Sequence, residues 1–366
     1  MNSAAQMSNA RAKTADARRK IAASELADFV ARLFTAAGVP DDAARVVATG
    51  LVDADLEGLH SHGVMLVDLY IERIRQGSVS RDGRASVISD RQGAIVLDAG
   101  NALGQLTGRQ AMDMAIGKAK EFAAGVVAVR HGFHFGTAGK YAQQAAAADC
   151  IGIAMCNTRP LMPAPGGAER VVGNNPIAVA LPTDDEIPLI LDMATSEAAM
   201  GKIRMAEKAS ELIPANWAVT AHGEPTTNPA EAVAGMLLPS GGAKGFGLAL
   251  MIDLMCGLLS GGASGAEVRA LYGDFAEPYD CSHLFIAIDI GRFGPSDDFR
   301  SRAAAAARRI RGARRAPEVP QLFTPGEPEW QRRQRANGVV MLDPSVADML
   351  NRFATKLGVT ASPLQQ

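Results

Sequence analysis

The sequence predicts an α/β fold. From about Arg91 onward, short β-branched or apolar runs alternate with Ala-rich helical stretches, a pattern typical of α/β packing. Before that point the apolar residues recur three and four apart, which predicts helices. The common nucleotide-binding versions of the fold are not expected. No Gly-x-Gly-x-x-Gly follows a strand, and Lys244 is followed by Gly245 rather than by the Ser or Thr of a Walker A loop.

Three amphipathic helices are expected in the first ninety residues. The first begins at Ser24 and stops at Gly38, the second begins near Asp41 and ends at Gly58, and the third runs from Val64 to Gln76. The apolar residues of the third helix share one face, so burial is expected for Leu66, Leu69, Tyr70, Ile71 and Ile74.

The rest of the chain supplies the strands and their covering helices. Helices are expected from Thr107, from Thr137, over the Ala- and Arg-rich residues 297–315, and from Ser345. The apolar run 246–259 contains Asp253 and is too short to cross a bilayer, so it predicts a buried core helix. Strands are expected at residues 94–97, 126–129, 151–156, 177–181, 189–192 and 284–290.

Composition excludes several classes of partner. The 366 residues are 48% hydrophobic, enough for two compact regions. A net charge of −2 gives no basic field, so neither nucleic acid nor a membrane is expected as a partner, and a small molecule is. The four cysteines show no Cys-x-x-Cys spacing, which indicates buried thiols in a reducing compartment, and a cytoplasmic location is expected.

Two histidine clusters, each ending in glycine, nominate a site. The clusters are residues 60–63, with His60 and His62, and residues 131–136, with His131 and His134. An imidazole with a pKa near 6.5 exchanges a proton near neutral pH, so acid–base chemistry is favoured. The alternatives are helix capping, chance proximity, and metal ligation assisted by Asp53, Asp55 or Glu57.

Two further segments have the chemistry of a ligand site. The glycine-rich residues 241–247 lead into an apolar helix, so backbone N–H groups and Lys244 suit an anion such as a pyrophosphate; a structural turn is the alternative. Asp192 ends an apolar strand, where ligands gather in α/β folds. It either caps a helix beginning near Ser196 or faces a histidine, raising the pKa of that ring.

An ordered series of motifs resembles the type-2 malate/L-lactate dehydrogenase family along nearly the whole chain. This family includes ureidoglycolate, 2,3-diketogulonate and sulfolactate dehydrogenases and reductases of cyclic imino acids. The motifs are Ala54-Asp55, Ser61-His62-Gly63, His134-Phe135-Gly136, Pro165-Gly166-Gly167, Gly173-Asn174-Asn175-Pro176, Asp192–Ser196, Lys244-Gly245 and Pro325-Gly326-Glu327.

The resemblance implies a fold and its organisation. The fold is a non-Rossmann malate/L-lactate dehydrogenase-type α/β arrangement, and members form homodimers. We expect residues 1–20 to be a disordered tail and 21–90 to be the helical part of a substrate and dimer region. Residues 91–260 would then form the cofactor-binding α/β region, and 261–366 would return to the first region.

The resemblance also implies a reaction, reversible hydride transfer between NAD or NADP and a 2-oxo acid/2-hydroxy acid pair or a cyclic imino acid. His62 matches the histidine that donates the proton in several members, and His134 matches the one given that role in others. With Asp192 they form the expected catalytic set. The expected cofactor contacts are Asp192, Met193, Ala194, Thr195, Lys244, Gly245, Pro325, Gly326 and Glu327.

The chain departs from the family in two places. The approach to the second histidine, usually Asn-Ser-Asn-like, is His131-Gly132-Phe133 here, and the other departure lies near the first cluster. Most members carry an arginine four residues after the histidine that matches His62. That arginine is placed to meet the substrate carboxylate, and here the residue is Leu66. We therefore expect an atypical substrate near Ser61 and Leu66, either more apolar or anchored by Arg159 or Arg130. The alternative functions are a metal-dependent hydrolase or lyase, although no metal site is assigned, and a catalytically silent ligand-binding homologue.

Overall fold

The computed structural model describes residues 18–360 and 362–364, which form two compact units. The first contains the chain up to Gly77, residues 81–83 and the chain from Glu329 onward; the second contains residues 78–80 and 84–328. The chain thus rejoins the first unit at Glu329 rather than at residue 261. The reason is that β10 (Cys281–Asp289) belongs to the sheet of the second unit.

The first unit is mainly helical, and its three N-terminal helices confirm the sequence prediction. The expected buried face of the third helix is buried throughout, because its apolar side chains recur at helical spacing. The helical elements are α2 (Ala23–Ala36), α3 (Asp41–Leu56), η1 (His60–His62), η2 (Val64–Leu66), α4 (Val67–Gln76), α11 (Glu327–Ala336) and α12 (Pro344–Leu357).

The first unit also contains a small sheet that the sequence did not predict. β1 (Arg19–Ala22) pairs antiparallel with β11 (Val339–Leu342), so that Lys20 lies opposite Met341. Residues 1–17 of the expected tail lie outside the described residues. Arg19 and Lys20 were placed in that tail wrongly, because a strand partner from the far end of the chain holds them.

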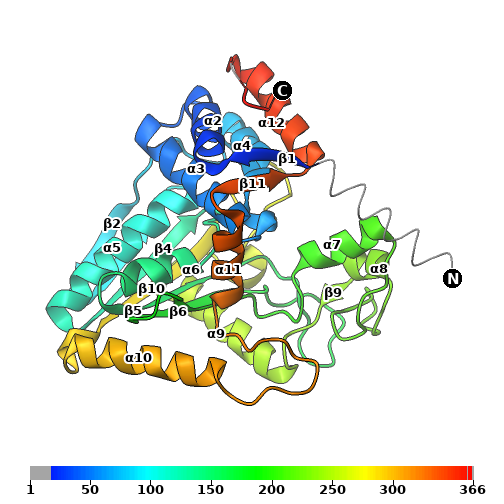
Figure 1. The fold of residues 1–366 in the computed structure, drawn as a ribbon. Coiled ribbons are helices and arrows are strands. Elements are labelled where there is room, and N and C mark those ends of the chain that lie inside the picture. Colours follow the sequence, from blue (N-terminus) through cyan, green and yellow to red (C-terminus); the bar gives the residue numbers. More distant parts are fainter. Residues whose placement is uncertain (1–17, 361, 365–366) are drawn as a thin grey trace. The chain divides into compact units, whose positions relative to one another are not determined.

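The second unit is built on a seven-stranded sheet (Figure 1). Its strands lie in the order β2-β3-β4-β10-β5-β6-β7. Among these described strands, β3 and β4 are the parallel pair and the other neighbours are antiparallel. The expected non-Rossmann α/β fold is therefore confirmed. The remaining strands are β2 (Ser86–Arg91), β3 (Ala94–Asp98), β4 (Ala124–Gly132), β5 (Cys150–Cys156), β6 (Ile177–Leu181) and β7 (Leu189–Met193).

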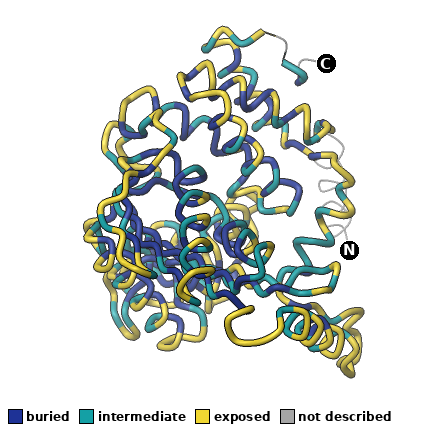
Figure 2. Tube along the Cα trace, turned by 90° about the vertical axis from the view of Figure 1, so that its left-hand side faces the viewer, coloured by how far each residue is buried: buried dark blue, intermediate teal, exposed yellow. Residues whose placement is uncertain are grey.

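Helices cover both faces of this sheet. Because side chains alternate between the faces of a strand, Val127 packs with Ala111 and Met112 of α5 (Gly104–Phe122), whereas its neighbour Ala128 packs with Ile252 and Cys256 of α9 (Ala243–Ser260). In Figure 2, where buried residues are dark blue, much of the buried part of the chain lies in these strands. α6 (Gly139–Ala146) lies on the α5 side, through Tyr141.

The second unit also includes a smaller hydrophobic cluster and a surface helix. The cluster contains Met162, Ile203, Leu237 and Ala249. It is formed in part by α7 (Met200–Ala209), α8 (Pro229–Ala234) and the pair β8 (Ala218–Val219) and β9 (Met236–Leu237). The Ala- and Arg-rich helix is α10 (Ser296–Arg311), whose residues are mostly exposed or half-buried, as expected.

The expectation that the apolar run 246–259 forms a fully buried helix is wrong. α9 has 18 residues, and only 39% of it is buried, so it is not enclosed by the core. By length and composition alone it is the one helix among the described residues that could cross a membrane. Its sheet-facing side holds Asp253, whose carboxylate accepts a 3.0 Å hydrogen bond from Asn157. Its other side is apolar and exposed at Leu248, Met251, Met255, Leu258 and Leu259.

Candidate active site

The sheet register brings several expected site segments to one edge of the second unit. Met155 pairs with Ile177, which pairs with Met193, and Cys156 pairs with His283 near the end of β4. The carboxyl ends of β4, β5 and β7 therefore meet at the same edge of the sheet. His134, Arg159 and Thr195 follow these three strand ends, at the position where ligands bind in α/β folds.

The second histidine cluster begins with a residue that a carboxylate holds. His131 has a left-handed φ of +49°, and its Nδ1 lies 2.9 Å from Asp98 Oδ2. Arg130 Nε donates to the same oxygen at 3.0 Å. Burial raises the pKa of Asp98, but hydrogen bonds from His131, the Gly100 N–H and Arg130 outweigh it and lower that pKa below its usual value. His131 and Arg130 are thus both engaged by Asp98.

Aromatic rings fix the backbone beside half-buried His134. The next residue, Phe135, stacks on His283 at 4.6 Å and on Tyr141 at 5.1 Å between ring centroids. The Tyr141 hydroxyl donates to the Phe135 carbonyl. Burial lowers the pKa of His283 to about 3, and its Nε2 lies 3.2 Å from Cys281 Sγ. Sequence reasoning missed His283, although a histidine inside an apolar strand was a visible signal.

The first histidine cluster lies in the first unit, in the short helices η1 and η2. His62 is half-buried, and burial lowers the pKa of its imidazole. Ser61 Oγ lies 3.0 Å from His62 Nδ1. Leu66, the position at which the sequence departs from the resembled family, is buried, with 2% of its surface exposed.

The three carboxylates considered as metal ligands have other partners. Arg333 Nη1 lies 2.7 Å from Asp53 Oδ1 and 3.6 Å from Glu57 Oε1. Asp55 binds His60 and the Val64 N–H. Within residues 18–360 and 362–364, no group of three His, Cys, Asp or Glu side chains is placed to hold a metal ion.

Asp192 caps a helix, but not the one expected from the sequence. It lies within β7, and its Oδ2 accepts a 2.8 Å hydrogen bond from the N–H of Gly139, the first residue of α6. The helix after β7, α7, begins at Met200 and has no side-chain cap. The expected cap near Ser196 is therefore wrong, because the chain continues without helix to Ala199.

Thr195 links β7 to the glycine-rich loop ahead of α9. Its N–H donates to the Asn174 carbonyl at 3.1 Å, and its carbonyl accepts the Ser240 N–H at 2.9 Å. The Thr195 hydroxyl is buried, and no described group pairs with it. A buried hydroxyl without a partner costs free energy, so it marks a position at which a ligand group would be accommodated favourably.

In the loop ahead of α9, the backbone at the helix N-terminus is not covered by side chains, since nothing lies within 4 Å of a Cβ on Gly241 or Gly242. Gly241 and Gly242 have φ of +62° and +65°, and a Cβ on Gly245 would lie 2.2 Å from the Ser240 carbonyl. Lys244 is exposed in the first turn, and no side chain caps the helix. Positive charge and N–H groups therefore coincide here, as an anionic ligand requires.

The turn at Pro325 also packs on β7. The Ile190 N–H donates to the Pro325 carbonyl at 3.1 Å, and Gly326 has a φ of +85° with its Cα beside Ile190. Glu327 is buried, and its carboxylate accepts hydrogen bonds from the Thr324 N–H and hydroxyl, each at 3.0 Å. These hydrogen bonds of Glu327 therefore hold this turn in place.

Arg159 differs from Arg130 in its surroundings. Its guanidinium is half-buried, and burial together with the nearby positive charges of Arg170 and Arg204 lowers its pKa. No carboxylate among the described residues pairs with it. A half-buried cation beside two like charges favours an anion at this position.

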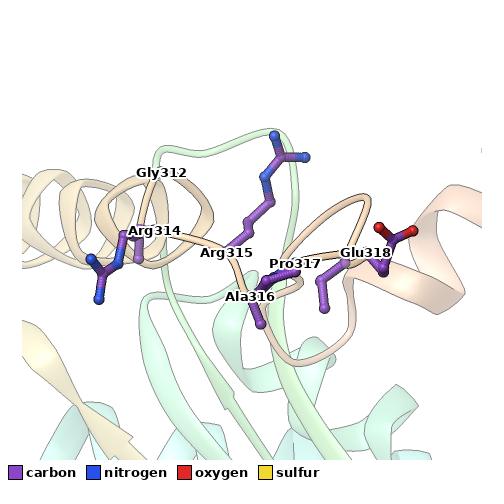
Figure 3. A pocket seen from close by; sticks show the side chains of 8 residues that line it. Gly312, Arg314, Arg315, Ala316, Pro317 and Glu318 are labelled. Atoms are coloured by element: carbon purple, nitrogen blue, oxygen red, sulfur yellow. The ribbon is translucent and has the colours of Figure 1, made fainter.

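An open hollow of about 670 Å³ lies elsewhere, along residues 312–319 (Figure 3). Arg314, Arg315 and Glu318 line it, and Arg315 donates to the Pro320 carbonyl. The hollow contains none of the expected site residues, and a single loop forms it. It is therefore not the candidate site.

Comparisons with known proteins show which family the chain is related to. Residues 21–351 match the family model described as malate/L-lactate dehydrogenase. A malate dehydrogenase from Pyrococcus abyssi is 37% identical over 349 residues, covering 93% of this chain and 95% of that protein. The NAD(+) ureidoglycolate dehydrogenase of Escherichia coli K12 is 35% identical, with 88% and 93% of the two chains covered.

The fold agrees with the same relationship. The solved malate dehydrogenase of Pyrococcus horikoshii OT3 has a TM-score of 0.86 and 35% identity to this chain, with 94% of this chain and 97% of that chain covered. Likeness at this level, over nearly the whole of both chains, extends through both units. The chain therefore belongs to the malate/L-lactate dehydrogenase family and is an oxidoreductase.

Proposed function

We propose that this chain transfers a hydride between NAD or NADP and a small 2-hydroxy acid/2-oxo acid pair, or a cyclic imino acid, with His62 exchanging the proton. Family membership and the names of relatives, which specify NAD(+) in one case and NADP(+) in another, support the cofactor class. The observation that carries the proposal is the half-buried imidazole of His62 beside Ser61.

The environment of His62 suits a general base. Because burial lowers its pKa below 6.5, the ring is neutral at pH 7 and accepts the proton of a substrate hydroxyl. Ser61 engages Nδ1, so we assign the proton exchange to Nε2. A bound nicotinamide would supply the acceptor for the hydride that leaves the carbon bearing this hydroxyl. His62 then carries the released proton, and it returns that proton in the reverse direction.

His134 and Asp192 complete the proposed catalytic set. His134 follows the end of β4, where the ring stack of Phe135, Tyr141 and His283 fixes the backbone. We assign it to holding the substrate or the nicotinamide amide by hydrogen bonding. Asp192 holds the N-terminus of α6 through Gly139 and places negative charge at the same sheet edge.

Arg159 is the proposed anchor for the substrate carboxylate. Arg130, the other candidate, is already bonded to Asp98, whereas no described carboxylate pairs with Arg159. An arginine and a carboxylate form two parallel hydrogen bonds, which orient the substrate as well as bind it. The anchor would replace the arginine that the chain lacks at Leu66. Ser61 completes the proposed substrate set, whereas the buried side chain of Leu66 is not available for a contact.

The second unit fits a pyridine nucleotide. Lys244 and Gly245 at the N-terminus of α9 would hold phosphate, and the unpartnered Thr195 hydroxyl provides a hydrogen-bonding group nearby, since Thr195 is bonded to Ser240 of the same loop. Residues 192–194, at the end of β7, and the turn 325–327, which is hydrogen-bonded to Ile190 of β7, would complete the contacts. The proposed cofactor residues are Asp192, Met193, Ala194, Thr195, Lys244, Gly245, Pro325, Gly326 and Glu327.

The exposed apolar side of α9 supports the proposal of a homodimer. Leu248, Met251, Met255 and Leu258 lie three or four residues apart along this helix, and Leu259 is next to the last of them. Such an exposed apolar patch marks a protein interface. A symmetric dimer would bury the same side of the helix in both copies.

A substrate panel tests the proposed function. Purified protein is assayed with malate, lactate, sulfolactate, ureidoglycolate and Δ1-piperideine-2-carboxylate, each with both cofactors in the appropriate redox state. Turnover of at least one substrate is expected, and His62→Ala should lower kcat by about 10²- to 10⁴-fold. Cofactor binding without any turnover would favour the silent homologue, and loss of activity to a chelator would favour the metal enzyme.

A further inference from the structure

Both carboxylate oxygens of Asp55 bind the loop that carries His62. Asp55 lies at the end of α3, and its Oδ1 is 2.9 Å from His60 Nδ1. Its Oδ2 accepts the Val64 N–H at 2.8 Å. These two partners flank His62 on either side, so one buried carboxylate spans the loop from residue 60 to residue 64.

The glycine after His62 is required by this carboxylate. A Cβ on Gly63 would lie 2.3 to 2.4 Å from the Asp55 carboxylate atoms, far inside any real contact. Gly63 has a φ of −90°, which other residues adopt readily, so close approach rather than conformation explains the glycine. Gly63 and Asp55 therefore act together.

Asp55 differs from the two carboxylates that flank it in the sequence, Asp53 and Glu57. Asp53 and Glu57 bind Arg333 on α11, whereas Asp55 binds the loop. The loop consists of two single 3₁₀ turns, η1 and η2, which have weak internal hydrogen bonding. Bonds to a buried carboxylate are stronger than neutral ones, so Asp55 supplies much of the order that the loop lacks.

We propose that Asp55 is a positioning residue, which fixes the orientation of His62 for proton exchange by holding the loop at His60 and Val64. This inference rests on the proposed function of His62. The second unit contains a similar pair, since the first histidine of its cluster, His131, is held by Asp98. In both units an acidic side chain holds the first histidine of the cluster; His62 follows His60 within η1, and His134 follows His131 just after the end of β4.

The test compares three variants with wild type, using the panel substrate that turns over fastest. Asp55→Leu keeps the branched shape at Cγ but removes both bonds, and kcat should fall by about 10²-fold, as for a displacement of about 1 Å. Asp55→Asn should retain most of kcat, because its amide oxygen can accept from the Val64 N–H and its NH₂ can donate to His60 Nδ1. Asp53→Asn, on the same helix, is the matched control and should leave kcat within about twofold of wild type.

Two measurements separate positioning from a general loss of structure. The Val64 amide should exchange with solvent faster in Asp55→Leu than in wild type, while the amides of the second unit keep their rates. In a His62→Ala background, adding Asp55→Leu should lower kcat by less than about twofold, since the group it positions is gone.

The outcomes distinguish this inference from the proposed function. Wild-type kcat in His62→Ala would overturn the proposed function. Loss of activity in His62→Ala together with wild-type kcat in Asp55→Leu would overturn the role of Asp55 alone. Multiplicative losses in the double variant, or an unchanged exchange rate at Val64, would also overturn it.

Discussion

At the scale of single residues, burial separates the histidines of this chain. His283 is fully buried in β10 between aromatic rings, His62 is half-buried in a loop, and His60 and His131 are bonded to carboxylates. The imidazole environments therefore differ within one molecule. The environments of His62 and His283 lead to measurable pH dependences, of kcat/KM for His62 and of the unfolding free energy for His283.

The pH profile of oxidation should report His62. Because burial lowers its pKa, the neutral ring persists below pH 6.5, and kcat/KM for hydroxy acid oxidation should fall only as pH drops through that lower pKa. The measurement is kcat/KM from pH 4.5 to 8 with the best substrate, and Ser61→Ala tests the neighbouring hydroxyl. An acid limb centred above pH 6.5 would contradict the assignment of His62 as base.

His283 should make stability depend on pH. Its pKa is about 3 in the folded chain and near 6.5 in the unfolded chain, so between these values the unfolded state binds more protons. Stability from this group is present above pH 6.5 and is lost as pH falls, by about 1.4 kcal/mol per pH unit. His283→Phe keeps a ring against Phe135 and should flatten the pH dependence of the unfolding free energy by that amount, measured by urea denaturation.

The control for His283 is the exposed His222. His222→Gln should leave the slope of wild type, because the side chain meets water in the folded and unfolded chain alike. Identical slopes for wild type and His283→Phe would show that His283 is protonated without cost.

Removal of Arg159 should weaken substrate binding more than cofactor binding. Arg159→Leu should raise KM for a carboxylate substrate by about 10- to 100-fold, because a charge-assisted, two-bond contact is worth roughly 1.5–3 kcal/mol. Arg159→Lys should recover part of the loss. Arg130→Lys is the comparison, since Arg130 is already paired with Asp98. Equal KM values for Arg159→Leu and wild type would exclude the anchor.

At the scale of elements, regular periodicity decided what the sequence could predict. The amphipathic helices α2 and α3 and the strand β6 were found because local apolar spacing determines them. β1 was missed because its partner β11 lies at the other end of the chain, and no local pattern encodes such a pairing. The apolar composition of α9 indicated burial, but it does not distinguish a core helix from one with an exposed apolar side.

For the candidate site, the sequence predicted the residues but not the contacts between them. The loop containing His62 was recognised from its residues, but the bonds from Asp55 that hold it join α3 to the loop in three dimensions. His131 and Asp98 are likewise brought together only by the parallel pairing of β3 and β4. Sequence spacing alone shows neither contact.

The exposed side of α9 should control the oligomeric state. Replacing Met255 and Leu258 by Lys places two charges on this side and should convert a dimer into monomers at micromolar concentration, measured by size-exclusion chromatography with light scattering. Ile310→Lys on α10 is the control, because Ile310 is an isolated exposed apolar residue. Dimers that persist in the double variant would place the interface elsewhere.

At the scale of the whole molecule, cofactor binding should stabilise the fold. At a concentration about 100-fold above Kd, NADH or NADPH should add about 2.7 kcal/mol to the unfolding free energy and raise Tm by several degrees. Lys244→Ala should reduce the shift, whereas Lys208→Ala, on α7, should not. Equal shifts in the two variants would exclude Lys244 from the nucleotide site.

The late position of β10 in the chain constrains how the protein is made. β10 lies between β4 and β5, yet the ribosome reaches Cys281 long after it has completed both neighbours. At ordinary translation speeds the wait is on the order of ten seconds, during which two strand edges lack their partner. Unpaired edges invite intermolecular pairing, so nascent chains that end before β10 should depend on chaperones more than full-length chains do.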